Sequence, residues 1–451
     1  MELFGTAGIR GPVTDVTPEL ALAVGRAVGM DANEDDSTVV IGRDGRDTGS
    51  SLAAAIEAGV TSAGTAVRRV GQVPTPALAF ASRGRYGVML TASHNPPSDN
   101  GIKLFTDGQE YDREREQSIA QRVESEVTAA EWEQWGHSQR TEVLLAYREA
   151  VVEYANSLGD RPELTVAVDC GNGMASLVTP QVLTTLGASV RSLNANVDGH
   201  FTARESKPTP ESLADLRRFV ANSDVAFGIG HDGDADRIVI LDEAGEVVHE
   251  DTILAILAER AVRESTAIDP VVVTTPNASG RIDQRVREAG GRVERVRLGA
   301  LHEGIATVRN NATDETAVAF AAEPWKHIHP RFGGWIDAVA SAAVFTRLVA
   351  ESGLDALRGP VQERPYRKES LDCPDDRKSA VMDSLKSSLP DTFPDADVAT
   401  EYGIRLDIPD GGWTLVRPSG TEPYIRIYAE SESVDNLVET VTECVDTALD
   451  R

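Results

Sequence analysis

Three aspartates stand at alternate positions in one short loop of the sequence, at Asp232, Asp234 and Asp236. Three carboxylates this close repel one another unless a cation neutralises them, and hard oxygen ligands suit Mg²⁺ or Ca²⁺. An EF-hand does not fit, because Arg237 stands where that loop requires glycine and the apolar run 238–241 follows at once. The loop predicts a Mg²⁺ site beside a phosphate that Arg237 also approaches. A solvated acidic turn is the alternative.

A serine loop precedes the aspartates by about 140 residues in the chain. Residues 91–97 read Thr-Ala-Ser-His-Asn-Pro-Pro and follow the apolar run 86–90. A serine at a strand end, followed by two stiffening prolines, is placed to present its hydroxyl, although Ser93 in an ordinary turn would bond its own backbone. Acyl transfer is not indicated, because no Gly-x-Ser-x-Gly elbow is present and His94 beside Ser93 does not by itself make a catalytic pair.

Two later loops carry residues that suit a phosphorylated ligand. Residues 417–423 read Arg-Pro-Ser-Gly-Thr-Glu-Pro, and Arg426 follows. Backbone N–H groups, hydroxyls and a guanidinium fork together match phosphate, so a phosphate site is predicted there rather than a plain inter-strand turn. Residues 322–330 place Lys326 among Trp325, His327 and His329. Metal binding by the two histidines would need further ligands, so a rim for a polar ligand is expected.

The elements that must position these loops have an α/β pattern. The β-branched runs 37–42, 164–169 and 270–275 each lead into a loop rich in Gly, Asp or Asn and then into a helical segment. Apolar runs without alternation indicate strands buried on both faces, as in mainly parallel sheets with helical crossovers. Because the pattern recurs at intervals of about a hundred residues or more, three related α/β domains are expected.

The C-terminal part has a different texture. Pro, Lys, Asp and Ser are frequent over 359–395, and a hairpin is predicted from 402–408 and 413–417 across a Pro-Asp-Gly-Gly turn. A further strand over 424–429 and a closing helix from about 433 complete a smaller α+β domain.

Composition limits the partners and the setting. The 451 residues carry a net charge of −28, and lysine occurs only six times. Such an acidic surface suits concentrated salt, which screens its self-repulsion, so a salt-rich cytoplasm of a halophilic organism is expected. It argues against nucleic-acid or membrane partners, which need a basic face. Cys170, Cys373 and Cys444 lack disulfide or zinc spacing, and the absence of a signal sequence or a long apolar run predicts a cytoplasmic chain.

Taken in order, these loops resemble those of the α-D-phosphohexomutase family, which includes phosphoglucomutase, phosphomannomutase and phosphoglucosamine mutase. The match also includes Phe-Gly-Thr-Ala-Gly-Ile-Arg-Gly at 4–11 and Gly-Ile-Lys-Leu-Phe at 101–105. The resemblance implies four domains around a central cleft. Their expected ranges are 1–145 with a phosphoserine loop, 146–250 with a Mg²⁺ loop, 251–358 with a sugar loop and 359–451 with a phosphate loop.

The resemblance also implies roles for individual residues. Ser93 would be the phosphoserine, and Arg10 and Lys103 would assist phosphoryl stabilisation and proton transfer. The implied ligands of one Mg²⁺ per chain are Ser93, Asp232, Asp234 and Asp236. The expected substrate contacts are Arg237, Glu323, Lys326, His327, Arg417, Ser419, Gly420, Thr421 and Arg426.

The implied activity is the interconversion of hexose 6-phosphate and hexose 1-phosphate. It would proceed through a phosphoserine enzyme and a hexose 1,6-bisphosphate. The expected partner is a small-molecule phosphosugar, and the expected oligomeric state is a monomer or a homodimer. A metal-dependent sugar phosphatase and a non-catalytic sugar-phosphate binding protein are the alternatives.

One loop departs from the family pattern. The family's sugar loop usually reads Gly-Glu-x-Ser-Gly-His, whereas residues 322–327 read Ala-Glu-Pro-Trp-Lys-His. Since this loop distinguishes hexoses in the family, Trp325 and Lys326 are expected to reshape the sugar preference. The sequence leaves open which of glucose, mannose and glucosamine is used.

Overall fold

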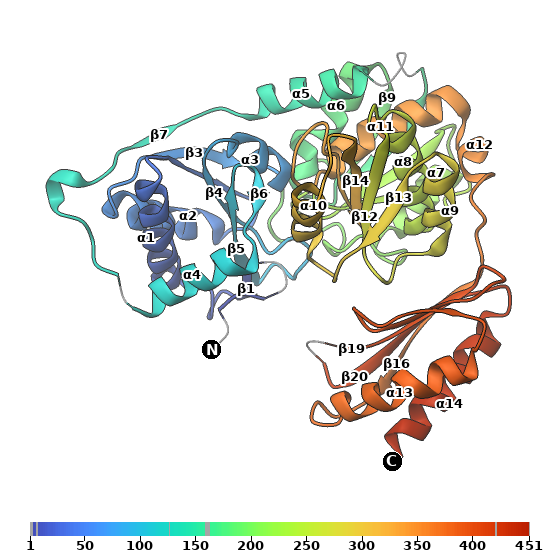
Figure 1. The fold of residues 1–451 in the computed structure, drawn as a ribbon. Helices are drawn as coiled ribbons and strands as arrows, with labels where there is room; N and C mark the ends of the chain where they lie inside the picture. Colours follow the sequence, from blue (N-terminus) through green and yellow to red (C-terminus); the bar gives the residue numbers. More distant parts are fainter. Residues whose placement is uncertain (1–2, 6–7, 126, 158–162, 420–421, 451) are drawn as a thin grey trace. The chain divides into compact units, whose positions relative to one another are not determined.

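Three mainly parallel α/β sheets and one antiparallel sheet follow one another along the chain (Figure 1), which confirms the predicted fold class. The computed structural model describes residues 3–5, 8–125, 127–157, 163–419 and 422–450. They form two units. One comprises Met1–Ile253 and Pro324–Arg358, and the other comprises Leu254–Glu323 and Gly359–Arg451. The four predicted domain boundaries stay a prediction.

The first sheet positions three of the expected site residues. Its strand order is β1-β5-β4-β2-β3-β7, with β6 paired to β5. The antiparallel strand β5 places Lys103 opposite Met89 of β4, and β1 places Arg10 opposite Gly101 of β5. Ser93 lies in the connection from β4 to β5, so the three side chains share one region of the sheet. The strands are β1 (Ile9–Pro12), β2 (Val39–Arg43), β3 (Val67–Gln72), β4 (Tyr86–Leu90), β5 (Asp99–Thr106), β6 (Gln109–Glu110) and β7 (Ser138–Arg140).

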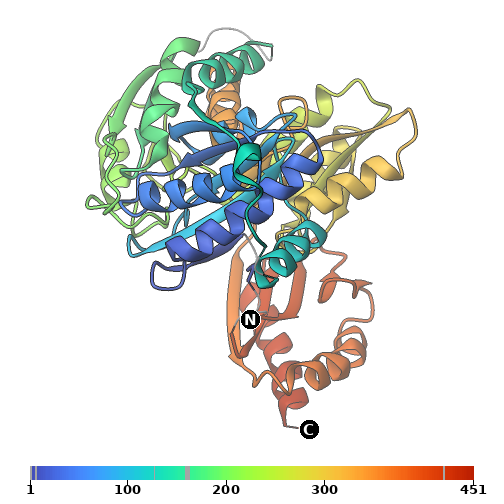
Figure 2. The ribbon, with the colours of Figure 1, turned by 90° about the vertical axis from the view of Figure 1, so that its left-hand side faces the viewer.

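Helices α1 and α2 lie side by side beside this sheet (Figure 2). Glycines allow the two backbones to meet, since a Cβ at Gly25 would lie 2.4 Å from the carbonyl oxygen of Ile56 and one at Gly59 would lie 2.3 Å from that of Leu22. Any larger residue at either position would force the helices apart. The helices of this region are α1 (Pro18–Glu34), α2 (Gly49–Ser62), α3 (Thr75–Ala81), α4 (Arg113–Glu124) and the 3₁₀ turn η1 (Trp132–Gln134).

The second sheet carries the aspartate loop. Its order is β11-β10-β8-β9, with β10 parallel to β8 and antiparallel to β11, and the loop joins β10 to β11. The helical segment expected after the run 164–169 is divided into a 3₁₀ turn and α6, because Pro180 lacks an N–H group and fits only the first helical turn. The elements are α5 (Leu144–Asn156), β8 (Thr165–Asp169), η2 (Met174–Leu177), α6 (Thr179–Leu186), β9 (Ser189–Leu193), α7 (Ala214–Ala221), β10 (Phe227–His231) and β11 (Ile238–Leu241).

A last segment returns to the same unit after residue 323. Asp337 caps α11 by accepting a hydrogen bond from the backbone N–H of Ala340, and most of the side chains on this helix are buried. The elements are β15 (Lys326–Ile328), α11 (Ala338–Ser352) and α12 (Leu354–Arg358), and α8 (Glu250–Arg263) leads from the first unit into the second.

The second unit contains a parallel arrangement, β13-β12-β14, and an antiparallel sheet, β16-β20-β19-β18-β17. The sequence analysis did not identify α13, whose buried Val381, Leu385 and Leu389 recur every four residues. The elements are β12 (Asp269–Thr274), α9 (Gly280–Glu288), β13 (Arg292–Arg295), α10 (Leu301–Asn310), β14 (Thr316–Glu323), β16 (Tyr366–Asp372), α13 (Lys378–Thr392), β17 (Asp397–Ala399), β18 (Ile404–Asp407), β19 (Trp413–Pro418), β20 (Tyr424–Glu430) and α14 (Val434–Leu449).

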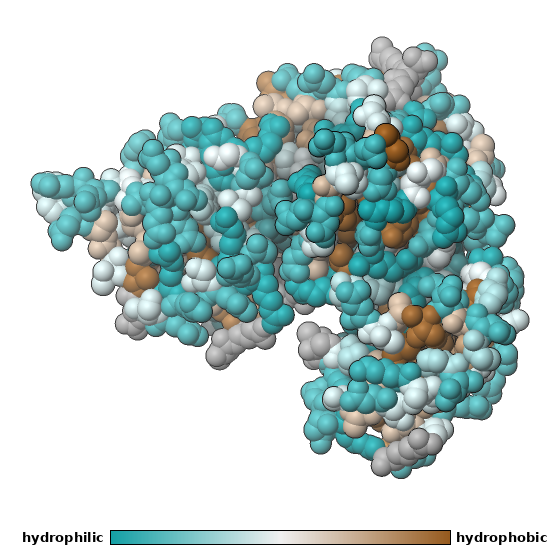
Figure 3. All heavy atoms as spheres, in the orientation of Figure 1, coloured by the Kyte–Doolittle hydropathy of each residue, from teal (hydrophilic) through white to brown (hydrophobic). Residues whose placement is uncertain are grey.

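The face drawn in Figure 3 is covered mainly by hydrophilic side chains, and apolar residues form small separate spots on it. This agrees with the acidic composition, while the halophilic setting stays a prediction. Among the described residues, the helices are all too short or too polar to cross a lipid bilayer.

Candidate active site

The hydroxyl of Ser93 points at the aspartate loop. Ser93 is fully buried, and its Oγ donates a hydrogen bond to Oδ2 of Asp232 at 2.7 Å. Its backbone has the left-handed conformation, with φ of 50°, in which its N–H donates to Oγ1 of Thr91 at 2.9 Å. The structure therefore brings together two side chains that are 139 positions apart in the sequence, as their expected binding of one Mg²⁺ requires.

The three aspartates form one buried cluster. A carboxylate oxygen from each of Asp232, Asp234 and Asp236 lies within 4.8 Å of the others, and all three side chains are buried. The left-handed backbone of Ala235, with φ of 59°, turns the chain between the last two. Oγ1 of Thr75 donates to Oδ2 of Asp234 at 2.6 Å, which ties the cluster to the start of α3.

This cluster fits a small divalent cation. Oδ1 of Asp234 and Oδ1 of Asp236 are buried, and neither has a hydrogen-bond partner among the described residues. Buried carboxylate oxygens without partners are costly unless a cation binds them. Burial, together with the charges of Asp236 and Asp234, raises the pKa of Asp232 well above its usual range. An all-oxygen donor set of this kind suits Mg²⁺.

Lys103 supplies positive charge to the cluster. Its buried Nζ lies 2.9 Å from Oδ2 of Asp236 and 3.4 Å from Oδ2 of Asp234. Burial alone would lower the pKa of Lys103, but Asp236, Asp234 and Glu110 outweigh burial and raise it. Burial likewise favours a higher pKa for Asp236, but Lys103, Lys326 and Arg237 hold that pKa well below its usual range. Lys103 is therefore an ammonium that neutralises these carboxylates.

Arg10 and His94 complete the surroundings of Ser93. Nε and Nη2 of Arg10 are buried, and no described residue accepts a hydrogen bond from either. Nδ1 of His94 lies 3.4 Å from Oγ of Ser93, and burial, followed by the charges of Arg237 and Arg10, lowers the pKa of His94 to about 3. A neutral imidazole beside a guanidinium with spare N–H donors makes this pocket receptive to an anion such as a phosphoryl group.

The altered sugar loop approaches the same cluster. Nζ of Lys326 lies 3.7 Å from Oδ2 of Asp236, and the Arg237 guanidinium lies 6.0 Å from the ring centre of Trp325. Trp325 has φ of 69°, which is rare for a bulky residue, and its carbonyl accepts a hydrogen bond from N–H of Ile238. The backbone of Trp325 is therefore held against β11, and its indole packs against an apolar cluster that includes Val239 and Leu241.

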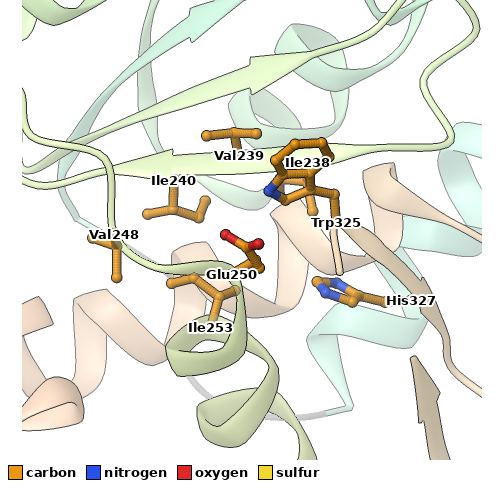
Figure 4. Close-up of a pocket in the computed structure, with 8 residues that line it drawn as sticks. All are labelled: Ile238, Val239, Ile240, Val248, Glu250, Ile253, Trp325 and His327. Carbon is orange, nitrogen blue, oxygen red and sulfur yellow. The ribbon is translucent and has the colours of Figure 1, made fainter. Parts of the chain in front are cut away.

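A shallow hollow lies under this indole (Figure 4), and its lining side chains leave no space for a water molecule. The side chains of Glu250 and His327 point toward it, and the rest of its lining is apolar. Ligand pockets usually enclose ~300 Å³ or more, so a sugar ring does not fit into this hollow. Its lining residues are Ile238, Val239, Ile240, Val248, Glu250, Ile253, Trp325 and His327.

His327 and His329 belong to a buried polar network. Nδ1 of His327 and Nε2 of His329 lie 3.0 Å and 2.9 Å from Oγ of Ser341, and Tyr154 contacts the other ring nitrogen of His329 at 3.3 Å. Burial lowers the pKa of each histidine to about 3, so both imidazoles are neutral. The substrate contact by His327 stays a prediction.

These histidines lead us to expect that the free energy of unfolding falls as the pH drops below 6.5. In the unfolded chain each imidazole takes up a proton near pH 6.5, whereas its folded pKa is about 3. Each therefore removes up to ~1.4 kcal/mol of stability per pH unit between those values. Asp337 opposes this trend, since burial raises its pKa to about 6 and the folded state then gains a proton first. Denaturant titrations at pH 7 and pH 5 measure the difference.

The matched variants are His329→Gln and His200→Gln, because the side chain of His200 is 69% exposed. We expect a smaller loss of stability between pH 7 and pH 5 in His329→Gln than in the wild type, and an unchanged loss in His200→Gln. Equal losses in all three proteins would contradict the neutral state of His329.

The predicted phosphate loop lies in the second unit. Arg417 of β19 and Arg426 of β20 are cross-strand partners, and Nε of each is buried without a hydrogen-bond partner among the described residues. Nη2 of Arg417 donates to the hydroxyl of Tyr428 at 3.0 Å. Burial would raise the pKa of Tyr428, but Arg417 and Arg426 outweigh burial and lower it. Two adjacent guanidiniums with spare donors favour an anion here.

The remaining predicted contacts are only partly described. Ser419 is buried, and its Oγ accepts a hydrogen bond from N–H of Glu422 at 3.2 Å. Gly420 and Thr421 lie outside the described residues. Oε2 of Glu323, at the end of β14, accepts a hydrogen bond from N–H of Gly299 at 3.3 Å. Their contacts with substrate stay predictions.

Several residues at the site were missed by the sequence analysis. Thr75 and Ser206 contact the aspartate loop, but nothing in their local sequence distinguishes them from other hydroxyl residues. Arg46 contacts the serine loop, and a signal was present here, because Asp44 and Arg46 lie in a Gly-containing loop directly after a buried strand.

Family models match three parts of the chain. They are described as phosphoglucomutase/phosphomannomutase alpha/beta/alpha domain I at residues 1–130, alpha/beta/alpha domain II at 146–245 and C-terminal domain at 394–447. Two archaeal relatives are each 40% identical. A phosphopentomutase of Thermococcus kodakarensis matches over 96% of this chain and 94% of its own length. A probable phosphoglucosamine mutase of Methanopyrus kandleri matches over 98% and 97%.

Solved structures share the fold. A phosphoglucomutase/phosphomannomutase family protein from Burkholderia thailandensis superposes with a TM-score of 0.86 at 24% identity, covering 99% of this chain and 97% of that one. An Aspergillus fumigatus N-acetylphosphoglucosamine mutase, solved with GlcNAc-6P and magnesium, has a TM-score of 0.63 at 16% identity and covers 99% and 95%. The family models and the full-length archaeal relatives together show that the chain belongs to the α-D-phosphohexomutase family and is a phosphomutase.

Proposed function

We propose that this chain interconverts a hexose 6-phosphate and a hexose 1-phosphate by way of a phosphorylated Ser93 and a bisphosphorylated sugar. The observation that carries the proposal is the 2.7 Å hydrogen bond from Oγ of Ser93 to Asp232 within the three-aspartate cluster. Phosphoryl transfer depends mainly on positioning and on neutralising charge. A serine oxygen beside a cation site and unpaired cationic donors is suited to both.

The proposed metal ligands are Asp232, Asp234, Asp236 and an oxygen on Ser93. A bound Mg²⁺ would withdraw charge from the phosphoryl oxygens. The buried donors of Arg10 lie in the same region and would bind the remaining phosphoryl oxygens through charge-assisted hydrogen bonds. Arg237, over the face of Trp325, adds a second guanidinium.

A proton must leave the sugar hydroxyl as that oxygen attacks phosphorus and the Ser93 oxygen departs. We assign Lys103 to this proton transfer. The negative charges of Asp234 and Asp236 stabilise the protonated form of Lys103. When other positive charge neutralises these carboxylates, the pKa of Lys103 falls. With those carboxylates neutralised, Lys103 would lose its ammonium proton to solvent, and the neutral amine would accept the hydroxyl proton from one sugar position and return it at the other.

The two ends of the sugar need separate binding. We assign the phosphate that does not react to Arg417, Arg426, Ser419, Gly420 and Thr421. The spare guanidinium donors of Arg417 and Arg426 support this assignment. We assign the sugar hydroxyls to Glu323, Lys326 and His327. A bisphosphate can then bind in either orientation, so either phosphate can return to Ser93.

A pentose phosphate is the second candidate substrate. It is favoured by the 40% identity to a phosphopentomutase and by the indole of Trp325 where the family usually has serine. A bulky residue in a sugar loop reduces the space for a hexose ring.

The test is a substrate panel with Mg²⁺, comprising the 1-phosphates of glucose, mannose, glucosamine and ribose, each primed with its bisphosphate. Formation of the hexose 6-phosphate supports the first candidate, and preferential formation of ribose 5-phosphate supports the second. Inorganic phosphate as the main product would instead indicate a phosphatase, and binding without turnover would indicate a non-catalytic protein.

Trp325→Ser is expected to shift the sugar preference. Removing the indole opens space beside Lys326, so the ratio of kcat/KM for glucose 1-phosphate to that for ribose 1-phosphate should rise by about 10-fold. Trp132→Ser is the matched control, because Trp132 is 78% exposed and lies in the chain segment between α4 and β7. An unchanged ratio in Trp325→Ser would refute a specificity role for this residue.

A further inference from the structure

The carbonyl oxygen of Ser93 accepts hydrogen bonds from two buried side chains. Nη2 of Arg46 and Oγ of Ser206 each lie 3.0 Å from it. Arg46 comes from the loop after β2 and Ser206 from the segment between β9 and α7, so two distant parts of the chain meet at one backbone atom. The charge of Arg46 is paired with Asp44, which is not one of the three clustered aspartates, and Ser206 is uncharged.

Arg46 binds the serine loop at several points. Its guanidinium also donates to the carbonyl oxygens of Asn95 at 2.7 Å and Asp99 at 2.9 Å, and to that of Pro96. A guanidinium is a planar group with five N–H donors, so one side chain fixes four carbonyls of this loop. Arg46 is fully buried.

Two neighbours fix Arg46 itself. Nε of Arg46 lies 3.1 Å from Oδ2 of Asp44, and the Phe201 ring centre lies 5.0 Å from the guanidinium. Asp44 Oδ2 also accepts from Oγ1 of Thr91, the hydroxyl that accepts a hydrogen bond from N–H of Ser93. Both backbone polar groups of Ser93 are therefore connected to the Asp44–Arg46 pair.

Ser206 connects the serine loop to the aspartate loop. Its Oγ donates to the Ser93 carbonyl and accepts from N–H of Gly233, at 3.0 Å in each case. A Cβ at Gly233 would lie 2.7 Å from Oγ of Ser206 and 2.8 Å from the Ser93 carbonyl oxygen, so only glycine allows this approach. One hydroxyl thus couples the backbone that carries Ser93 to the backbone between Asp232 and Asp234.

These contacts act on a strained residue. Ser93 has φ of 50°, and a non-glycine residue keeps such a left-handed conformation only where its surroundings impose it. If the chain relaxed to negative φ, the direction of the Cα–Cβ bond would change. Oγ would then leave the position 2.7 Å from Asp232.

We propose that Arg46 and Ser206 are positioning residues that hold Ser93 in this conformation and thereby set its hydroxyl against the metal-binding carboxylates. The inference rests on the proposed role of Ser93. A displacement of about 1 Å can reduce turnover by ~100-fold without altering substrate binding. The loss of Ser206 or Arg46 should therefore lower kcat and leave KM largely unchanged.

The test compares Ser206→Ala and Arg46→Lys with Ser82→Ala. Ser82 is the matched control, because it is also a buried serine whose Oγ donates to a backbone carbonyl, that of Ala79 at the end of α3. We expect Ser206→Ala to lose about 10- to 100-fold in kcat with KM within about 2-fold, and Arg46→Lys to lose at least as much. Ser82→Ala should keep both constants. If Arg46→Lys does not fold, the kcat and KM of Ser206→Ala alone test the proposal.

Amide hydrogen exchange of residues 91–99 gives a readout that does not depend on the reaction. Exchange should become faster in Ser206→Ala and stay unchanged in Ser82→Ala. Wild-type kcat and unchanged exchange in Ser206→Ala would overturn the proposal even if Ser93 is phosphorylated. Faster exchange in Ser206→Ala, in a protein whose Ser93 is never phosphorylated, would keep the positioning contact and reject the proposed function instead.

Discussion

Replacing Ser93 by alanine is expected to reduce mutase turnover by at least ~10³-fold, since removal of a covalent nucleophile leaves only binding and electrostatic effects. The fold should remain, because the backbone contacts of Ser93 with Thr91, Arg46 and Ser206 do not involve its hydroxyl. A coupled assay of sugar 6-phosphate formation, with Mg²⁺ and bisphosphate supplied, measures the effect.

Ser98→Ala is the matched control for this variant. Ser98 lies in the same loop, is exposed, and its hydroxyl contacts only Asp99 among the described residues. Its turnover should equal that of the wild type. Substantial mutase turnover in Ser93→Ala, at a rate near that of Ser98→Ala, would show that the phosphoryl group does not pass through residue 93.

Replacing Lys103 by methionine is expected to destabilise the metal-free protein by about 3–5 kcal/mol, because the positive partner of a buried ion pair is removed and its carboxylates remain without compensation. Asp234 and Asp236 would lose the ammonium that lies within 3.4 Å of both. Mg²⁺ should stabilise this variant more than it stabilises the wild type, since the cation replaces the missing positive charge. Urea unfolding with EDTA and with Mg²⁺ measures both effects.

Lys386→Met provides the comparison for Lys103→Met. Lys386 pairs with Asp383 at 2.9 Å, but both side chains are more than half exposed, so that pair contributes little to stability. Similar unfolding free energies for Lys103→Met and Lys386→Met, or equal responses to Mg²⁺, would contradict the electrostatic role assigned to Lys103.

The local pattern of the sequence was sufficient for the strands that carry the site. The apolar runs at 86–90 and 238–241 are strands with those bounds in the structure, because a β-branched or apolar run buried on both faces has few other conformations. The clustering of the three aspartates was also predictable, since carboxylates at alternate positions of one loop lie close together and favour a neutralising charge. The Mg²⁺ ion itself stays a prediction.

Long-range contacts were not predictable in the same way. Thr75 and Asp234 are separated by 159 positions and Ser93 and Ser206 by 113, and no local pattern records either pair. The helix α13 was missed because it contains four serines and an internal proline, while only three buried apolar residues reveal its period. Tertiary packing stabilises such a helix more than the intrinsic helix propensity of its residues does.

The most direct test of the account is the location of the phosphoryl group on the enzyme. The wild-type protein is incubated with Mg²⁺ and hexose 1,6-bisphosphate, digested with trypsin, and its peptides are analysed by mass spectrometry. We expect one phosphoryl group in the peptide of residues 86–103, on Ser93, and its removal when hexose 6-phosphate is added. An enzyme that turns over while Ser93 stays unmodified, or while another residue carries the phosphoryl group, would contradict the account.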